Sequence, residues 1–248
     1  MTPVLARSLT VSREDVLTGE RHVAVRDLDL CIETDQRVAL VGANGAGKTS
    51  LLLACVGAVP FTGTLRVCEL SVEPRTLDRV RAQVGFVFAE PSDQLFCDTV
   101  AEEVRYGPRA RGVDEPTVER RSLEALERVG LSDKAARSPH SLSFGEQRRL
   151  ALAATLACAP ALLLLDEPTA NLDGRARQQV LTALERSGGT TLIATHDLDF
   201  ALSLAARVIV LAGGEIVGDG PASVVLRDAA LLDRAGLLPP LGGVEPPP

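Results

Sequence analysis

The chain has 248 residues, 46% hydrophobic and 24% charged, which is ordinary for an α/β protein with a substantial core. Its formal net charge of −7 and the lack of a basic tract disfavour nucleic acid as a main partner, because phosphate-backbone binding relies on clustered lysine and arginine. Five scattered cysteines without a C-x-x-C pair argue against a disulfide framework or a zinc site, and we expect all five to be small buried side chains.

The first 70 residues are rich in expected strands. Alternating or continuous apolar stretches at residues 28–32, 38–41 and 63–67 have the length and composition of strands. The first thirty residues also carry several charges without an apolar core, so we expect no secretory leader there.

A phosphate-binding loop follows the second of these strands. The stretch from Gly42 to Thr49 fits the pattern G-x-x-x-x-G-K-[ST] at every position. Its backbone N–H groups must converge on phosphate oxygens, so small residues that tolerate unusual φ are needed at the turn. Lys48 would reach the β- and γ-phosphates, the Thr49 hydroxyl would ligate Mg²⁺, and residues 50–56 would form a helix whose N-terminus faces the anion. The expected nucleotide contacts here are Gly42, Ala43, Asn44, Gly45, Ala46, Gly47, Lys48, Thr49 and Ser50.

The middle of the chain predicts a helical insertion. Charge density rises around residues 98–128, and residues 118–129 have helical spacing of apolar side chains. Ser143 and Glu146 then fit a capping box, which would begin a helix running to residue 158. A capped helix start also offers free N–H groups and a positive dipole end to a phosphate, and the sequence alone leaves both interpretations open.

Two short apolar runs end in polar residues. The longest uncharged stretch, residues 150–165, is shorter than the roughly 20 residues of a spanning helix and contains Pro160, so we predict a helix and then a buried strand. Asp166 and Glu167 follow that strand at the sheet edge where α/β folds bind ligands. One carboxylate would hold the water shell of Mg²⁺ while the other faces the attacking water.

Residues 191–195 predict another buried strand, which ends at His196. A histidine there can hydrogen-bond the γ-phosphate and the attacking water, although alone such a residue is more often packed or on the surface. A helical crossover over 175–184, a hairpin over 208–217 and a frayed tail complete the expected elements.

Taken together and in this order, these motifs resemble the ATP-binding subunit of ABC transporters over about residues 5–226. The resemblance implies an α/β fold with a mixed or parallel central sheet, an N-terminal antiparallel β subdomain and a helical insertion at about 95–145. It places one ATP-binding domain over residues 1–226 and a partly disordered tail over 227–248. The residues that carry it are the loop 42–49, the signature 142–147, the strand 162–167, the loop 171–173 and His196.

The same resemblance implies an ATPase that works as a dimer, with two chains sandwiching two molecules of ATP and Mg²⁺. Glu167 would polarise the attacking water, Asp166 would support the metal and His196 would orient the γ-phosphate. Each site would take Lys48 from one chain and signature residues from the other. The nucleotide contacts implied outside the phosphate loop are Arg13, Ser143, Gly145, Glu146 and Asp173.

Residues 87–96, 99–100 and 106–108 are similar to the cobalt/nickel and vitamin importers of the energy-coupling-factor class. This implies a peripheral subunit at the cytoplasmic face of the cell membrane, whose membrane partners dock near residues 89–106 and which forms a homodimer or a heterodimer. The alternatives are a weakly hydrolysing regulatory half of a heterodimer and an ABC-type ATPase without membrane partners.

Three residues depart from the family pattern. Ala89 replaces a glutamine that usually ligates Mg²⁺, which would weaken the metal site rather than destroy it, because Mg²⁺ readily keeps waters. Arg13 stands where an aromatic often stacks on adenine, and either a stacked or a solvated guanidinium fits. Phe144 replaces a glycine of the signature, and we expect its ring to pack toward the helical insertion, leaving Ser143 and Gly145 free for their contacts.

Overall fold

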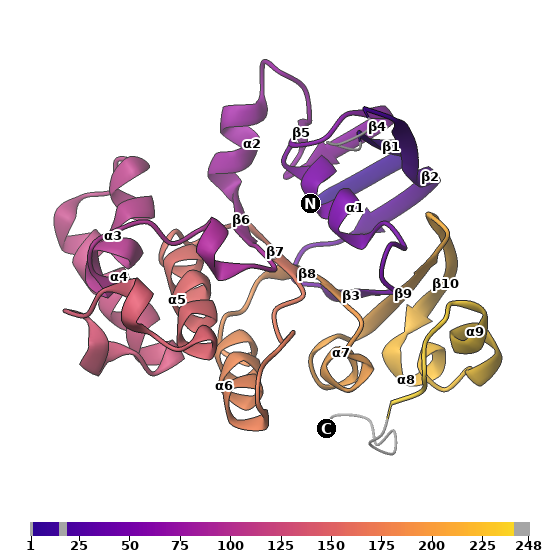
Figure 1. Ribbon diagram of the computed structural model, residues 1–248. Coiled ribbons are helices and arrows are strands. Elements are labelled where there is room, and N and C mark those ends of the chain that lie inside the picture. Colours follow the sequence, from indigo (N-terminus) through magenta and orange to yellow (C-terminus); the bar gives the residue numbers. More distant parts are fainter. Residues whose placement is uncertain (1, 15–18, 241–248) are drawn as a thin grey trace.

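Two sheets organise the chain, and the computed structural model describes residues 2–14 and 19–240 of it (Figure 1). The first sheet is antiparallel with the order β2-β1-β4-β5, and the second has six strands in the order β10-β9-β3-β8-β7-β6. The first sheet consists of β1 (Val4–Glu14), β2 (Arg21–Ile32), β4 (Phe61–Val67) and β5 (Leu70–Ser71). The second consists of β3 (Arg37–Val41), β6 (Val84–Val87), β7 (Leu162–Asp166), β8 (Thr190–Thr195), β9 (Arg207–Ala212) and β10 (Glu215–Pro221).

The six-stranded sheet is mixed. Its strands β9, β3, β8, β7 and β6 run parallel, and β10 returns antiparallel along β9. Every residue of β7 and β8 is buried, which agrees with a parallel sheet covered on both faces. The carboxyl ends of β3, β7 and β8 therefore meet at one edge, where the expected site residues follow each strand.

Helices cover both faces of this sheet. On one face, α1 (Lys48–Cys55) lies between the two sheets, and Leu51 and Leu52 share a core with Val4 and Leu164 (Figure 1). On the other face lie α5 (Phe144–Ala157), α6 (Gly174–Glu185) and α7 (Leu198–Leu204). The short elements α2 (Leu77–Gln83), η1 (Pro91–Asp93) and α8 (Ala222–Val225) complete the flanks.

The expected helical insertion is present. It contains α3 (Val100–Ala110), α4 (Glu115–Val129) and the turns η2 (Ser132–Lys134) and η3 (Pro139–Ser141). Thr99 and Asp114 cap the two helices through their side chains, and Gly130 ends α4 in the left-handed conformation. Val104, Leu126 and Leu150 share one core, so α3 and α4 pack on α5. The expected mixed central sheet, N-terminal antiparallel β subdomain and helical insertion are therefore all present.

The C-terminal tail, the cysteines and the helix lengths can each be compared with what the sequence predicts. Residues 227–240 of the expected tail contain α9 (Ala229–Arg234), whose Leu231 and Leu232 are buried in the core beside α7 and α8; residues 241–248 lie outside the described part of the chain. All five cysteines are free, but the expectation that all are buried holds only for Cys55: Cys68, Cys97 and Cys158 are partly buried, and Cys31 is exposed because alternate residues of β2 face solvent. In the ranges 2–14 and 19–240, none of the helices is long and apolar enough to cross a bilayer.

Candidate nucleotide site

The phosphate loop connects β3 to α1 and depends on glycine at two close approaches. Gly47 has a φ of +105°, and a Cβ there would lie 2.3 Å from the carbonyl oxygen of Ala24. A Cβ at Gly42 would lie 2.3 Å from the carbonyl oxygen of Leu211. Both contacts are shorter than any allowed approach, so the residue pattern reflects a packing requirement of this loop. The loop is consequently held against both sheets.

Lys48 stands at the first turn of α1 and is buried, with its side chain 6% exposed. Its Nζ donates to the carbonyl oxygens of Gly42 (2.7 Å) and Ala43 (3.2 Å) and lies 3.5 Å from Glu167 Oε1. A buried ammonium held by two neutral carbonyls and one carboxylate can exchange these partners for phosphate oxygens, which bear more charge.

Thr49 and Asp166 come together at the ends of α1 and β7. The Thr49 hydroxyl donates to Asp166 Oδ1 over 3.0 Å. Burial raises the pKa of Asp166, and the hydrogen bond from Thr49 opposes that rise. A hydroxyl and a carboxylate side by side form the kind of oxygen donor set that Mg²⁺ accepts, so these residues fit the expected metal.

Glu167 and His196 face one another across the ends of β7 and β8. Glu167 Oε2 lies 2.9 Å from His196 Nδ1 and also accepts from the His196 backbone N–H over 3.3 Å. The Glu167 backbone adopts a φ of +46°, which is uncommon for a non-glycine residue, and its N–H donates to the Ala194 carbonyl over 2.8 Å. The side chain of Glu167 is 16% exposed and that of His196 is 54% exposed, so the pair opens toward solvent.

Lys48, Thr49 and Glu167 line a cleft of about 640 Å³, a size that suits a nucleotide. Asp166 and His196 adjoin it through their contacts with Thr49 and Glu167. Half-buried Arg13 also lines this cleft, and its contact with adenine stays a prediction. His22 also lines the cleft, opposite Arg13 in the β1–β2 register, and the sequence analysis gave it no role. The position of His22 beside the cleft depends on the pairing of β1 with β2, which the local sequence does not indicate.

The signature residues form a separate cleft of about 630 Å³, which shares no residue with the first. Here the capping box is present: Glu146 Oε2 accepts from the Ser143 backbone N–H over 2.9 Å, and Ser143 Oγ accepts from the Glu146 N–H over 3.4 Å. Lys134 of the insertion pairs with Glu146 and holds the pKa of that carboxyl at about 2. Gly145 and Asp173 line the same cleft, and Asp173 caps α6 by accepting from the Ala176 N–H over 2.7 Å.

Arg148 is a site residue that the sequence analysis missed. It is 2% exposed, and its guanidinium donates to the carbonyl oxygens of Glu167 and Ala89. Its charged carbon lies 5.1 Å from the centroid of the Phe144 ring. The Phe144 ring thus meets a side chain one turn along its own helix, and it lines the signature cleft together with Lys134 of the insertion.

The segment after β6 bears on the missing glutamine at position 89. Gln94 Nε2 donates to Thr155 Oγ1 over 3.0 Å and its Oε1 accepts from the Phe88 N–H over 3.4 Å. Its amide is thus committed to α5 and is not a substitute. Nearby, Phe96 (62% exposed) and Tyr106 (52% exposed) stack edge to face at 4.8 Å beside a groove of about 200 Å³.

Comparisons with known proteins agree with this geometry. The sequence model of the family described as "ABC transporter" matches residues 25–170. The energy-coupling factor transporter ATP-binding protein EcfA of Methanothermobacter thermautotrophicus is 40% identical over 86% of this chain and 71% of its own length. The nickel import ATP-binding protein NikO of Rhodobacter capsulatus is 39% identical over 90% of this chain and 93% of its own length.

Two solved structures share the fold. One is cbiO1 from Clostridium perfringens, described as part of the ABC transporter complex cbiONQ, with a TM-score of 0.79 at 25% identity over 94% of each chain. The other is a dimeric post-hydrolysis state of the ATP-binding cassette MJ0796 bound to ADP and Pi, with a TM-score of 0.78 at 26% identity over 88% of this chain and 98% of that chain.

Proposed function

Since this chain belongs to the ABC transporter family and is an ATPase of its cobalt/nickel and energy-coupling-factor class, we propose that it powers a membrane importer. The solute would be a metal ion such as nickel or cobalt, or a vitamin-like molecule. The observation that carries the proposal is that Glu167 contacts both Lys48 and His196 at the cleft that Lys48 and Glu167 line. The protein would act as a peripheral subunit at the cytoplasmic face of the membrane.

In the proposed reaction, each side chain has a task that its position allows. Glu167 accepts a hydrogen bond from the attacking water, and His196, with Nδ1 on Glu167, directs its other ring nitrogen to the γ-phosphate. Lys48 exchanges its carbonyl partners for phosphate oxygens. Thr49 and Asp166 would hold Mg²⁺, which supplies positive charge to the phosphate oxygens when it is bound.

We infer that the working unit contains two such chains, or this chain and a related ATPase. Members of this family dimerise, and the structure of MJ0796 is a dimer. In this chain the phosphate-loop cleft and the signature cleft share no residue, so Ser143 and Gly145 of one chain would close over the nucleotide of the other. This arrangement would bring two half-sites together around each ATP.

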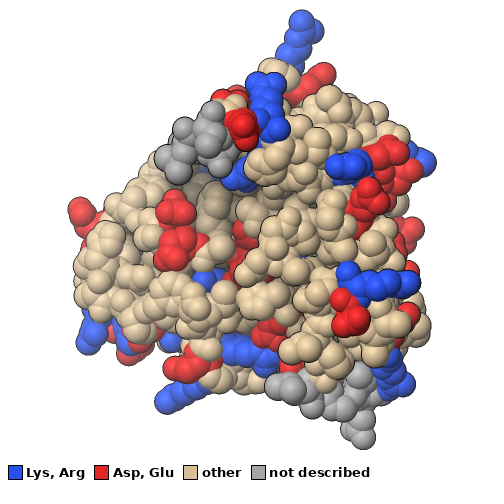
Figure 2. Space-filling view, turned by 45° about the vertical axis from the view of Figure 1, so that its right-hand side comes forward, with Lys and Arg blue, Asp and Glu red and all other residues tan. Residues whose placement is uncertain are grey.

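The membrane subunits would dock near residues 89–106, where Phe96 and Tyr106 expose apolar surface beside a groove. The face shown in Figure 2 has acidic and basic side chains interspersed, which gives no comparable support to a nucleic-acid partner. Phe96→Ala with Tyr106→Ala should abolish co-purification with co-expressed membrane subunits and leave the ATP hydrolysis of the isolated chain unchanged. Leu123→Ala, which removes an exposed apolar side chain from α4, is the matched control.

Transport itself is tested in proteoliposomes that contain the membrane subunits. ATP-dependent accumulation of radiolabelled nickel or cobalt that Glu167→Gln abolishes supports a metal importer. Accumulation of a labelled vitamin instead would support the other solute class. Full ATP turnover without membrane association, and without uptake of either, would favour the ATPase that lacks membrane partners.

A second candidate is a weakly hydrolysing regulatory half of a heterodimer. Ala89 favours it, because its side chain offers no oxygen for Mg²⁺ and Gln94 is committed to Thr155. Ala89→Gln separates the candidates. A large gain in turnover supports a weakened metal site, whereas no change removes the basis for this alternative.

A further inference from the structure

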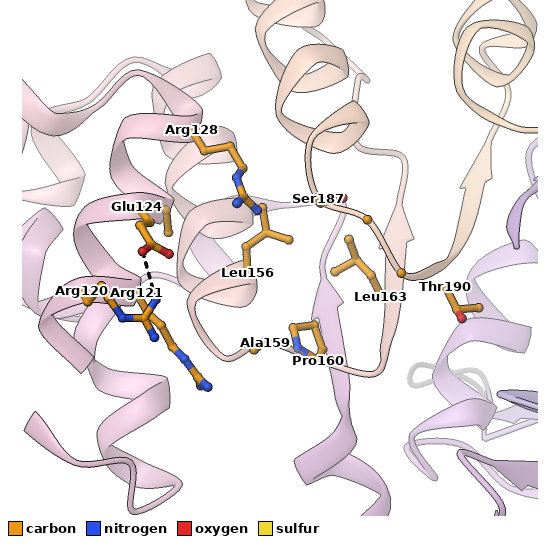
Figure 3. Close-up of a pocket in the computed structure, with 13 residues that line it drawn as sticks. Arg120, Arg121, Glu124, Arg128, Leu156, Ala159, Pro160, Leu163, Ser187 and Thr190 are labelled. Atoms are coloured by element: carbon orange, nitrogen blue, oxygen red, sulfur yellow. Dashed lines mark hydrogen bonds and ion pairs between the residues drawn. The ribbon is translucent and has the colours of Figure 1, made fainter. Parts of the chain in front are cut away.

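A third cavity, of about 370 Å³, lies at the amino ends of β7 and β8, on the sheet edge opposite the phosphate loop (Figure 3). Its walls come from α4 of the insertion, from the turn that precedes β7 and from the turn that precedes β8. None of its lining residues lines either cleft described above. Its volume falls in the range of small-molecule sites.

The side chains that line this cavity carry a net positive charge. Three arginines of α4 line it together with one acid, Glu124, and Arg120 pairs with that acid over 3.0 Å. Arg121 and Arg128 are half-buried, and across residues 2–14 and 19–240 neither forms a hydrogen bond or an ion pair. Two guanidinium groups thus border one cavity without a paired carboxylate among the described residues.

Two glycines with backbone N–H groups unpaired among the described residues line the cavity on the other wall. Gly188 and Gly189 both have positive φ, +58° and +77°, and within the described residues their N–H groups donate to no backbone carbonyl or side chain. A Cβ built on either glycine would meet no atom within 4 Å, so the space beside this turn is open. Consecutive unpaired N–H groups in such a turn form a concavity that suits an anion.

The floor between these donors is apolar, formed by Leu156, Pro160 and Leu163. Figure 3 shows Arg128 over Leu156, with Arg120 and Arg121 further along α4. The cavity therefore has a cation toward each end and an apolar surface between them. This suits an elongated anion with several phosphoryl oxygens better than a single chloride.

We propose that this cavity binds a small phosphorylated ligand. The forked guanidinium groups of Arg121 and Arg128 donate hydrogen bonds to the phosphoryl oxygens of this ligand. The N–H groups of Gly188 and Gly189 bind the same ligand from the sheet side. Since the walls belong to the insertion and to the sheet, the bound ligand ties these two parts together at a place distant from the ATP cleft. This is a binding site separate from the nucleotide site.

Pyrophosphate is the probe, and isothermal titration at constant ionic strength is the measurement. The protein carries Lys48→Ala, so that the phosphate loop no longer competes for the probe. We expect this protein to bind one pyrophosphate, and the further changes Arg121→Gln and Arg128→Gln to weaken binding about 100-fold, since each lost charged pair is about tenfold. The control, Arg75→Gln just before α2 with Arg79→Gln in α2, changes two exposed arginines, removes the same charge and should bind as before.

Three results would overturn the proposal: no pyrophosphate binding in the Lys48→Ala protein, unchanged binding after loss of Arg121 and Arg128, or equal weakening in the control that lacks Arg75 and Arg79. Thermal melting without ligand checks that each variant is folded. Should the double α4 variant not fold, Arg128→Gln alone serves, with an expected loss of about tenfold. Retained affinity in that variant would equally contradict the proposal.

Discussion

Replacing Arg148 by methionine should slow ATP hydrolysis far more than it destabilises the protein. Arg148 reaches from α5 to the main chain of two segments, the carbonyl of Ala89 after β6 and the carbonyl of Glu167 after β7. Glu167 has a positive φ of +46°, a conformation that costs on the order of 1–3 kcal/mol and persists only when its surroundings hold it. Arg148 is thus a positioning residue for Glu167.

The stability terms oppose one another. Losing two hydrogen bonds from a charged donor removes about 1.5–3 kcal/mol each, although the Glu167 carbonyl keeps a second donor, the Ala170 N–H at 3.2 Å. Against this, Arg148 is buried and forms no ion pair with any residue that the structure describes, and burial lowers its pKa; a buried charge costs several kcal/mol that methionine avoids. We therefore expect a net loss of about 1–2 kcal/mol in the free energy of unfolding. A displaced Glu167 should lower kcat about 100-fold, with KM for ATP little changed.

Steady-state phosphate release and denaturant unfolding of the same preparations check this expectation. Arg37→Met is the matched control, because Arg37 also donates to a main-chain carbonyl, that of Glu185 over 2.8 Å, but at the opposite edge of the sheet. The control should lose similar stability and keep its kcat. If Arg148→Met kept full kcat, or if kcat fell equally in both variants, the reasoning about Glu167 would be refuted.

Two further predictions follow from close contacts and charge. Gly47→Ala should abolish ATP binding in a nucleotide-binding titration, because its Cβ would lie 2.3 Å from a carbonyl oxygen; Gly112→Ala, with a similar positive φ but open space around it, should cost stability and keep ATP binding. Lys134→Gln should lower the free energy of unfolding by about 1.5–3 kcal/mol at pH 7. Because the folded pKa of Glu146 lies at about 2, below its ordinary 4.5, this stabilisation is present above pH 4.5 and is lost as the pH falls through 2. The difference between wild type and Lys134→Gln should therefore narrow over that window, and a constant difference would contradict the assignment.

Local patterns predict the parts of the site whose backbone is fixed by neighbours in sequence. The phosphate loop follows from glycine spacing, and the capping box of Ser143 and Glu146 follows from their separation. Glu167 and His196 follow short apolar runs, and parallel strands bring them to 2.9 Å of one another. Each of these features follows from residues that are close in sequence, together with the rule that parallel strands bring their carboxyl ends to one edge of the sheet.

Other contacts depend on segments that are distant in sequence, and no local pattern indicates them. In the sequence, Arg148 is one more charged residue of the predicted helix, and only the fold places Ala89 and Glu167 beside it. Lys134 likewise meets Glu146 only because the insertion folds back on α5. For α9 a signal was available: the Leu231-Leu232 pair after a capping Asp228 indicates a short buried helix rather than a tail.

The most direct test is phosphate release by the purified chain with saturating ATP and Mg²⁺, wild type beside Glu167→Gln. We expect wild type to turn over, and the variant to bind ATP while its kcat falls by about 10²–10⁴-fold, the usual contribution of a general base. Glu215→Gln, a change to an exposed carboxylate on β10, should behave as wild type. Full turnover by Glu167→Gln would contradict the catalytic role that the geometry supports.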